Sequence, residues 1–222
     1  MLANLRYSLP LCLALALPWA TPATADIIDL ANNLSQAGGS NSRVNDILWP
    51  AQAFTTDATH TTVTAVTTIL KSDSTTTGTL NLYIYSSAAN KPNTLVTSIG
   101  SYDIASQLTT TFTNYTLSSL NVSLNPSTQY FLVLGGSSSM ANGDAWWGFT
   151  ASTSGQGFPS DNTVSPDSGQ SWLDPSQSSP QQMRIQATSS DIPEPASLGL
   201  MGAGMVGWFF TRRRTARKKI CA

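Results

Sequence analysis

Chemically versatile side chains are scarce in this 222-residue sequence. Its two cysteines, Cys12 and Cys221, both lie near the ends of the chain. The stretch 26–191 between them contains no cysteine, no glutamate and a single histidine, His60. A disulfide framework and a thiolate metal site are therefore excluded from this stretch, which must be held together by its own hydrophobic core.

Positive charge is also scarce in the same stretch. It contains four basic residues and eleven aspartates, which gives a net charge of −7, whereas six further basic residues lie at 212–219. An acidic surface repels phosphate backbones, so we do not expect nucleic acid as a partner.

The shortage of catalytic side chains argues against an enzyme. A Ser-His-Asp triad would have to use His60, which lies at an expected turn near Asp57, and no G-x-S-x-G sequence supplies a nucleophile. Glycosidase chemistry would need paired aspartates, but these are scattered beside turn residues. Calcium at 142–144 or 161–174 is the remaining metal alternative. We expect no cofactor and no metal, and a hydrolase is the least favoured function.

The first 25 residues have the three parts of a secretory signal. Arg6 supplies a positive charge, and 9–19 is a short apolar run. A cleavage site follows, formed by Ala23, Ala25 and Asp26. We therefore predict a signal helix at 1–25 that is recognised by the secretion machinery and removed by signal peptidase. The alternative of an uncleaved anchor is disfavoured, because the run is too short to span a hydrocarbon core about 30 Å thick.

A second targeting pattern lies near the C-terminus. An uncharged run at 196–211 follows a Pro-Glu-Pro triplet and precedes an arginine cluster. A helix over this run is about 24 Å long and can span a membrane if its flanking residues snorkel. The positive-inside rule places the arginines in the cytoplasm and the triplet outside. The residues that define the pattern are Pro193, Glu194, Pro195, Arg212, Arg213 and Arg214.

This combination resembles the PEP-CTERM sorting signal of Gram-negative bacteria over about residues 192–214. The resemblance implies a membrane-embedded transpeptidase, exosortase, that cuts near the triplet and releases or re-anchors the protein at the surface. Two prolines bar a helix at the membrane edge and keep the segment extended for a protease. We predict a linker at 189–195, a single transmembrane helix at 196–211 and a basic cytoplasmic tail at 212–222. A plain tail anchor with an incidental triplet is the alternative.

Residues 26–188 are expected to form an exported all-β domain. Threonine favours strands, the Ser, Gly and Asn clusters favour turns, and 80–85 alternates with period two. Short strands separated by turns predict an antiparallel β-sandwich, jelly-roll-like, with a long loop at 155–180. The expected strands are 51–55, 61–70, 80–85, 94–99, 111–117, 122–124, 130–134, 145–150 and 183–187.

The order of segments over about 45–188 also resembles the exported domain called choice-of-anchor R. This resemblance rests on 51–55, 80–85 and 125–134, the last of which is a turn that leads into a strand opened by a tyrosine. It implies no established activity.

The tryptophans are the side chains that point to a ligand. Trp146 and Trp147 are adjacent in an expected strand, so one should face the core and the other the solvent. Trp172 lies in a polar loop, and an exposed tryptophan can stack on a sugar ring. Core packing or edge covering is the alternative use of these rings. We therefore expect a non-enzymatic protein of the cell surface or extracellular matrix, with a carbohydrate-binding module that contacts extracellular polysaccharide as the alternative.

Overall fold

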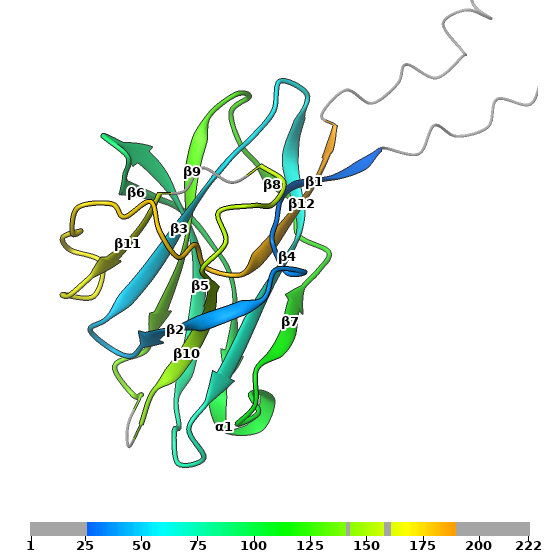
Figure 1. Ribbon diagram of the computed structural model, residues 1–222. Helices are drawn as coiled ribbons and strands as arrows, with labels where there is room; N and C mark the ends of the chain where they lie inside the picture. Colours follow the sequence, from blue (N-terminus) through cyan, green and yellow to red (C-terminus); the bar gives the residue numbers. More distant parts are fainter. Residues whose placement is uncertain (1–25, 141–142, 158–160, 190–222) are drawn as a thin grey trace, which may run out of the picture. The chain divides into compact units, whose positions relative to one another are not determined.

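Two antiparallel sheets contain almost all the regular structure (Figure 1). The computed structural model describes residues 26–140, 143–157 and 161–189. The expected signal helix at 1–25 and transmembrane helix at 196–211 lie outside these residues. The all-β, antiparallel fold class expected from the sequence is confirmed, and each expected strand overlaps an observed one.

The first sheet, sheet A, is built on one long central strand. Its strands are β1 (Ile27–Asn32), β2 (Gly38–Val44), β4 (His60–Ser72), β7 (Thr113–Leu117), β8 (Val122–Ser123), β10 (Ala145–Thr150) and β12 (Met183–Ser189). The central strand β4 pairs with β7, β8, β10 and β12, whereas β1 pairs with β12 and β2 pairs with β10. A single helical turn, α1 (Ile104–Gln107), precedes β7 and is capped by Asp103.

The second sheet, sheet B, has five strands. In spatial order they are β11 (Asn162–Ser165), β3 (Trp49–Thr55), β9 (Gln129–Gly136), β5 (Thr79–Ala88) and β6 (Lys91–Asp103). A two-residue turn joins β5 to β6, and both of its residues, Ala89 and Asn90, have positive φ angles of 50° and 59°. Turns of this kind match the right-handed twist of the paired strands.

The two sheets pack face to face around a hydrophobic core. Alternate residues of β5 enter this core, as the period-two pattern predicts. Fully burying one large apolar side chain contributes about 1.5–3 kcal/mol, so this core is the main source of stability for a domain without disulfides. Its fully buried side chains include Phe54, Leu80, Leu82, Ile84 and Leu132 from sheet B and Val66, Leu70, Trp147, Met183 and Ile185 from sheet A.

The sequence pattern does not predict the strands β1, β2 and β11. In β2 only Val44 is buried, so the strand has no apolar alternation and is defined by its pairing with β10. β11 lies inside the segment 155–180, which the pattern predicts to be a loop, and it pairs with β3. Partners from elsewhere in the chain therefore decide these strands.

Candidate functional site

Cations and aromatic rings alternate across the outer face of sheet A. Trp146 on β10 is paired in register with Arg43 on β2 and with Lys71 on β4. The Lys71 ammonium lies 5.8 Å from the centroid of the Trp146 ring and 5.0 Å from that of Phe112. A cation–π contact at an exposed site is worth about 0.5–1 kcal/mol. These four residues are called the cation–aromatic row below.

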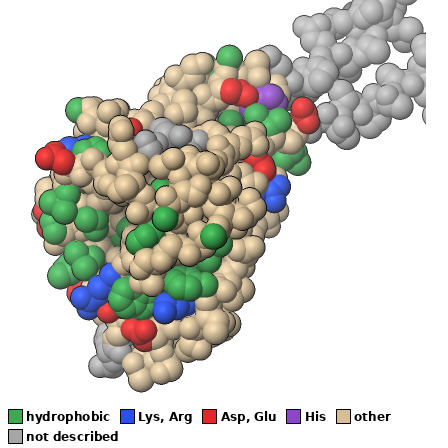
Figure 2. All heavy atoms as spheres, viewed as in Figure 1, with side chains coloured by type: hydrophobic (Ala, Val, Ile, Leu, Met, Phe, Trp, Pro, Cys, Tyr) green, Lys and Arg blue, Asp and Glu red, His purple; other side chains and the backbone are tan. Residues whose placement is uncertain are grey.

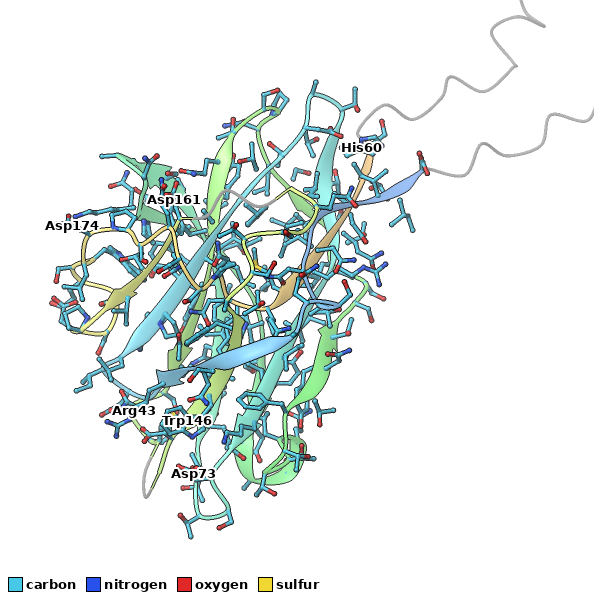
Figure 3. The ribbon with its side chains drawn as sticks, viewed as in Figure 1. Arg43, His60, Asp73, Trp146, Asp161 and Asp174 are labelled. Carbon is cyan, nitrogen blue, oxygen red and sulfur yellow. The ribbon has the colours of Figure 1, made fainter. Side chains whose placement is uncertain are left out.

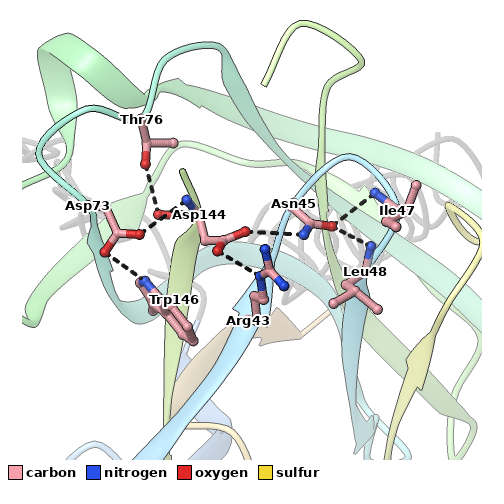
Figure 4. Close-up of polar contacts among 8 residues, drawn as sticks. All are labelled: Arg43, Asn45, Ile47, Leu48, Asp73, Thr76, Asp144 and Trp146. Carbon is pink, nitrogen blue, oxygen red and sulfur yellow. Dashed lines mark hydrogen bonds and ion pairs between the residues drawn. The ribbon is translucent and has the colours of Figure 1, made fainter. Parts of the chain in front are cut away.

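Two aspartates hold one end of this row (Figure 4). Asp144 accepts hydrogen bonds from Arg43 Nε at 2.7 Å and from Asn45 Nδ2 at 3.1 Å. Asp73 accepts from Trp146 Nε1 at 3.1 Å and from the backbone N–H of Asp144 at 3.3 Å. The hydrogen bond to Asp144 raises the pKa of the Arg43 guanidinium above its usual value. Both carboxylates thus accept hydrogen bonds from protein groups, and they orient the Trp146 and Arg43 side chains of the row.

The segments considered for calcium contain acids that bind protein groups. Asp144 binds Arg43, Asp161 accepts from Gln129 Nε2 at 3.3 Å, and Asp174 pairs with Lys91 at 2.8 Å. Across 26–140, 143–157 and 161–189, no three or more His, Cys, Asp or Glu side chains gather into a group that could hold a metal ion. The described residues therefore give the calcium alternative no support.

The adjacent tryptophans face opposite sides of sheet A. Trp147 is completely buried, and its indole N–H donates to the carbonyl oxygen of Gln182 at 2.9 Å. A ligand cannot stack on this ring, so the expectation that Trp147 binds a sugar is wrong. Trp146 is half-buried on the outer face, where Asp73 and Lys71 contact it.

Trp172 lies over the outer face of sheet B. Its ring makes an edge contact with Tyr85, and Tyr85 makes one with Tyr83, at centroid distances of 6.0 and 6.3 Å. The Tyr83 ring stacks on Trp49 at a centroid distance of 5.5 Å. These four half-buried rings cover a small apolar cluster formed by Ala51, Ala53, Phe131 and Val133. Trp172 therefore covers this apolar cluster on sheet B, which agrees with the edge-covering role that was the alternative to ligand binding.

His60 begins β4, after the turn expected at this position. Its Nδ1 lies 2.7 Å from Asp57 Oδ2. Burial alone would raise the pKa of Asp57, but hydrogen bonds from the backbone N–H groups of His60 and Thr59 and from the His60 ring outweigh burial and lower it. The pair closes a local turn, at the end of the domain away from Arg43, Asp73 and Trp146 (Figure 3).

A groove of about 600 Å³ lies beside the cation–aromatic row, and sequence reasoning missed it. Its volume is within the range of about 300–1,000 Å³ that is common for ligand sites. Figure 2 shows hydrophobic side chains beside basic ones on this side of the domain, over β2 and β10. No lining residue is charged. The lining residues are Leu34, Gln36, Gly38, Gly39, Ser40, Ile69, Phe112, Thr113, Asn114, Gly148 and Gln182.

The comparisons with known proteins identify the C-terminal pattern. Residues 191–214 match the family model described as PEP-CTERM protein-sorting motif, so the sorting signal expected from the sequence is confirmed. The match covers the sorting motif and leaves the domain before it unassigned. No curated protein and no solved structure matches the chain. The resemblance to choice-of-anchor R stays a prediction.

The targeting residues themselves lie outside the described part of the chain. This holds for Ala23, Ala25 and the motif residues 193–195 and 212–214, whereas Asp26 is the first residue described. The signal cleavage site therefore stays a prediction. In the residues that the structure does describe, no helix is long and apolar enough to cross a membrane.

Proposed function

We propose that this protein is a non-enzymatic component of the cell surface or extracellular matrix, which exosortase sorts and which displays its β-sandwich outside the membrane. The observation that carries the proposal is the spacing of the two targeting signals around the fold. β1 begins at Ile27, directly after the predicted cleavage site, and β12 ends at Ser189, just before the motif match at 191–214. Cleavage at both signals leaves every strand of the sandwich intact.

The geometry of sheet A also suits display. Ile27 pairs with Thr188, so the two ends of the described domain lie side by side. His60 pairs with Ser189, and Lys71 lies eleven residues further along β4. At about 3.3 Å per residue, the cation–aromatic row is about 36 Å from the strand end that leads to the sorting motif. A tether at this strand end would leave the row and the groove accessible.

The positions of the carboxylates favour a structural role over catalysis. Asp29 binds Arg184 at 2.7 Å, and Asp57 closes its turn with His60. These two acids are tied to different turns and strands, and in the neighbouring pair Asp73 and Asp144 protein donors occupy both carboxylates. A carbohydrate-binding module is the second candidate function, and the uncharged groove beside Phe112 is the observation that favours it.

The sorting part is tested with the wild type and Glu194→Ala, each expressed in a host with exosortase and in one without it. We expect the wild type to lose the segment 196–211 only when the enzyme is present. Glu194→Ala should keep the segment 196–211 and stay in the membrane in both hosts, because it removes the only glutamate of the chain from between the two prolines.

The matched control is Asp174→Ala, which removes an exposed carboxylate outside the motif and should be processed like the wild type. Equal mass and equal membrane retention of wild type and Glu194→Ala in both hosts would contradict the proposal. Its non-enzymatic part would fail if the processed protein released new reducing ends from polysaccharides.

A further inference from the structure

We propose that the groove on the outer face of sheet A binds a neutral polysaccharide, with Phe112 as the stacking platform and Gln182 as a hydrogen-bonding group. The proposal deepens the second candidate function and rests on it. The groove differs from the site expected from the sequence, because its lining includes none of Trp146, Trp147 and Trp172.

The chemistry of the lining indicates the class of ligand. Amide and hydroxyl groups of Ser40, Thr113 and Asn114 offer both donors and acceptors, and no lining side chain is charged. A polyanion would find no cation in the groove itself and would meet a domain with a net charge of −7. A chain of neutral sugars presents hydroxyl groups and apolar ring faces, which this lining matches.

Gln182 is the observation that makes the groove more than a surface hollow. This lining residue is only 4% exposed, and its Nε2 donates to the carbonyl oxygen of Gln36 at 2.9 Å. That hydrogen bond fixes the orientation of the amide, so Oε1 lies close to Gly148 on the groove floor. Within the described residues no donor reaches Oε1. A ligand hydroxyl in the groove can donate to this oxygen in place of water.

Phe112 supplies an apolar surface at the groove wall. Its side chain is 41% exposed, and Lys71 lies over the ring at 5.0 Å. Gly38, Gly39 and Gly148 keep the floor without side chains. At Gly39 an added Cβ would lie 2.9 Å from the backbone nitrogen of Ala151, so the packing there requires glycine. A sugar ring can therefore approach the backbone of the floor while its apolar face stacks on the phenyl ring.

The test uses the full-length protein in a detergent without a sugar headgroup, titrated calorimetrically with soluble polysaccharides. The probes are dextran, a soluble β-glucan and mannan as neutral chains, and polygalacturonate as the acidic chain. We expect binding to at least one neutral probe, with equal affinity at low and high salt. Phe112→Ala should weaken this binding about tenfold through loss of stacking. Gly148→Val, which fills the floor, should weaken it as well.

The matched control is Leu95→Ala, which truncates a side chain that is 48% exposed on sheet B and should bind like the wild type. Thermal unfolding of each variant separates a lost site from a lost fold. The proposal is overturned if no neutral probe binds, if only polygalacturonate binds, or if Phe112→Ala and Gly148→Val bind like the wild type. None of these results affects exosortase sorting, which is measured by mass and membrane retention.

Discussion

The outer faces of the two sheets carry aromatic side chains in opposite settings. On sheet B, Trp172 and its segment lie over Tyr83, Tyr85 and the small apolar cluster beneath them. On sheet A, the described residues leave the groove beside Phe112 open. An aromatic side chain on a sheet face is therefore a ligand candidate only where the chain's own loops leave it uncovered.

Local polar contacts explain why the segment around Trp172 stays over sheet B. Asp167 accepts from the backbone N–H of Ser171 at 2.7 Å and from the hydroxyl of Ser165 at 2.8 Å. Lys91, at the start of β6, pairs with Asp174 at 2.8 Å. These contacts tie the loop to itself and to the sheet, so its tryptophan serves as a cover.

The largest loss of stability should come from a substitution in the core between the two sheets. Trp147→Ala empties a fully buried position and should lower the free energy of unfolding by about 3–5 kcal/mol. Trp146→Ala, one residue earlier on the outer face, should cost less than about 1 kcal/mol, because it loses only surface contacts. Urea denaturation measures both. Equal losses would contradict the assignment of these two residues to opposite faces.

The covered and open faces are compared directly by Trp172→Ala and Phe112→Ala. Removing Trp172 exposes the apolar cluster on sheet B and should cost about 2 kcal/mol of stability. Removing the exposed ring of Phe112 should cost about 0.5 kcal/mol. The shift in urea midpoint at an unchanged slope reports each loss. A Phe112 variant as unstable as the Trp172 variant would show that Phe112 is structural.

Replacing a glycine should also cost more stability in the loop that covers sheet B than in the groove on sheet A. Gly169 in the covering loop has a φ of +84°, and an added Cβ would lie 2.9 Å from the Trp49 ring. Gly169→Ala should therefore cost about 1–2 kcal/mol. At Gly148 in the groove the closest contact would be 3.3 Å, so Gly148→Ala should change stability by about 0.5 kcal/mol or less. Thermal unfolding of the two variants checks the order.

Acid should loosen the segment that covers sheet B and leave the groove on sheet A unchanged. Hydrogen bonds from the side chain and backbone of Ser171, and then from Ser165, lower the pKa of Asp167. A carboxylate with a lowered folded-state pKa stabilises the fold fully above its unfolded value of about 3.9, and this contribution is lost as the pH falls through the folded value. The segment around Trp172 should therefore loosen below about pH 4. The groove has no ionisable lining residue and should still bind its ligand.

Hydrogen exchange corrected for intrinsic rates measures this loosening at 166–176. In Asp167→Asn the segment should exchange quickly at neutral pH and lose the acid dependence. Equal protection of this segment at neutral and acid pH in the wild type would refute the role given to Asp167.

The sequence by itself determined the fold class and the sorting motif. Alternation at 80–85 is a local property of the chain and predicted β5, and short strands separated by turns predicted an antiparallel sandwich. The sorting motif at 191–214 is a contiguous segment, so a linear pattern identifies it without any tertiary information. The pattern also predicted that Trp146 and Trp147 face opposite sides, because side chains alternate along any strand.

Only the tertiary structure decided which of these faces is buried and where a ligand can bind. Alternation sets a period, but the opposing sheet selects Trp147 for the core. Gly135 lies in β9 because it pairs with Asn81 of β5, and it must be glycine because the Trp49 ring packs where a side chain would be. The groove combines residues from five separate segments, at 34–40, 69, 112–114, 148 and 182. No local pattern predicts such a site, since strand pairing brings its walls together from distant parts of the chain.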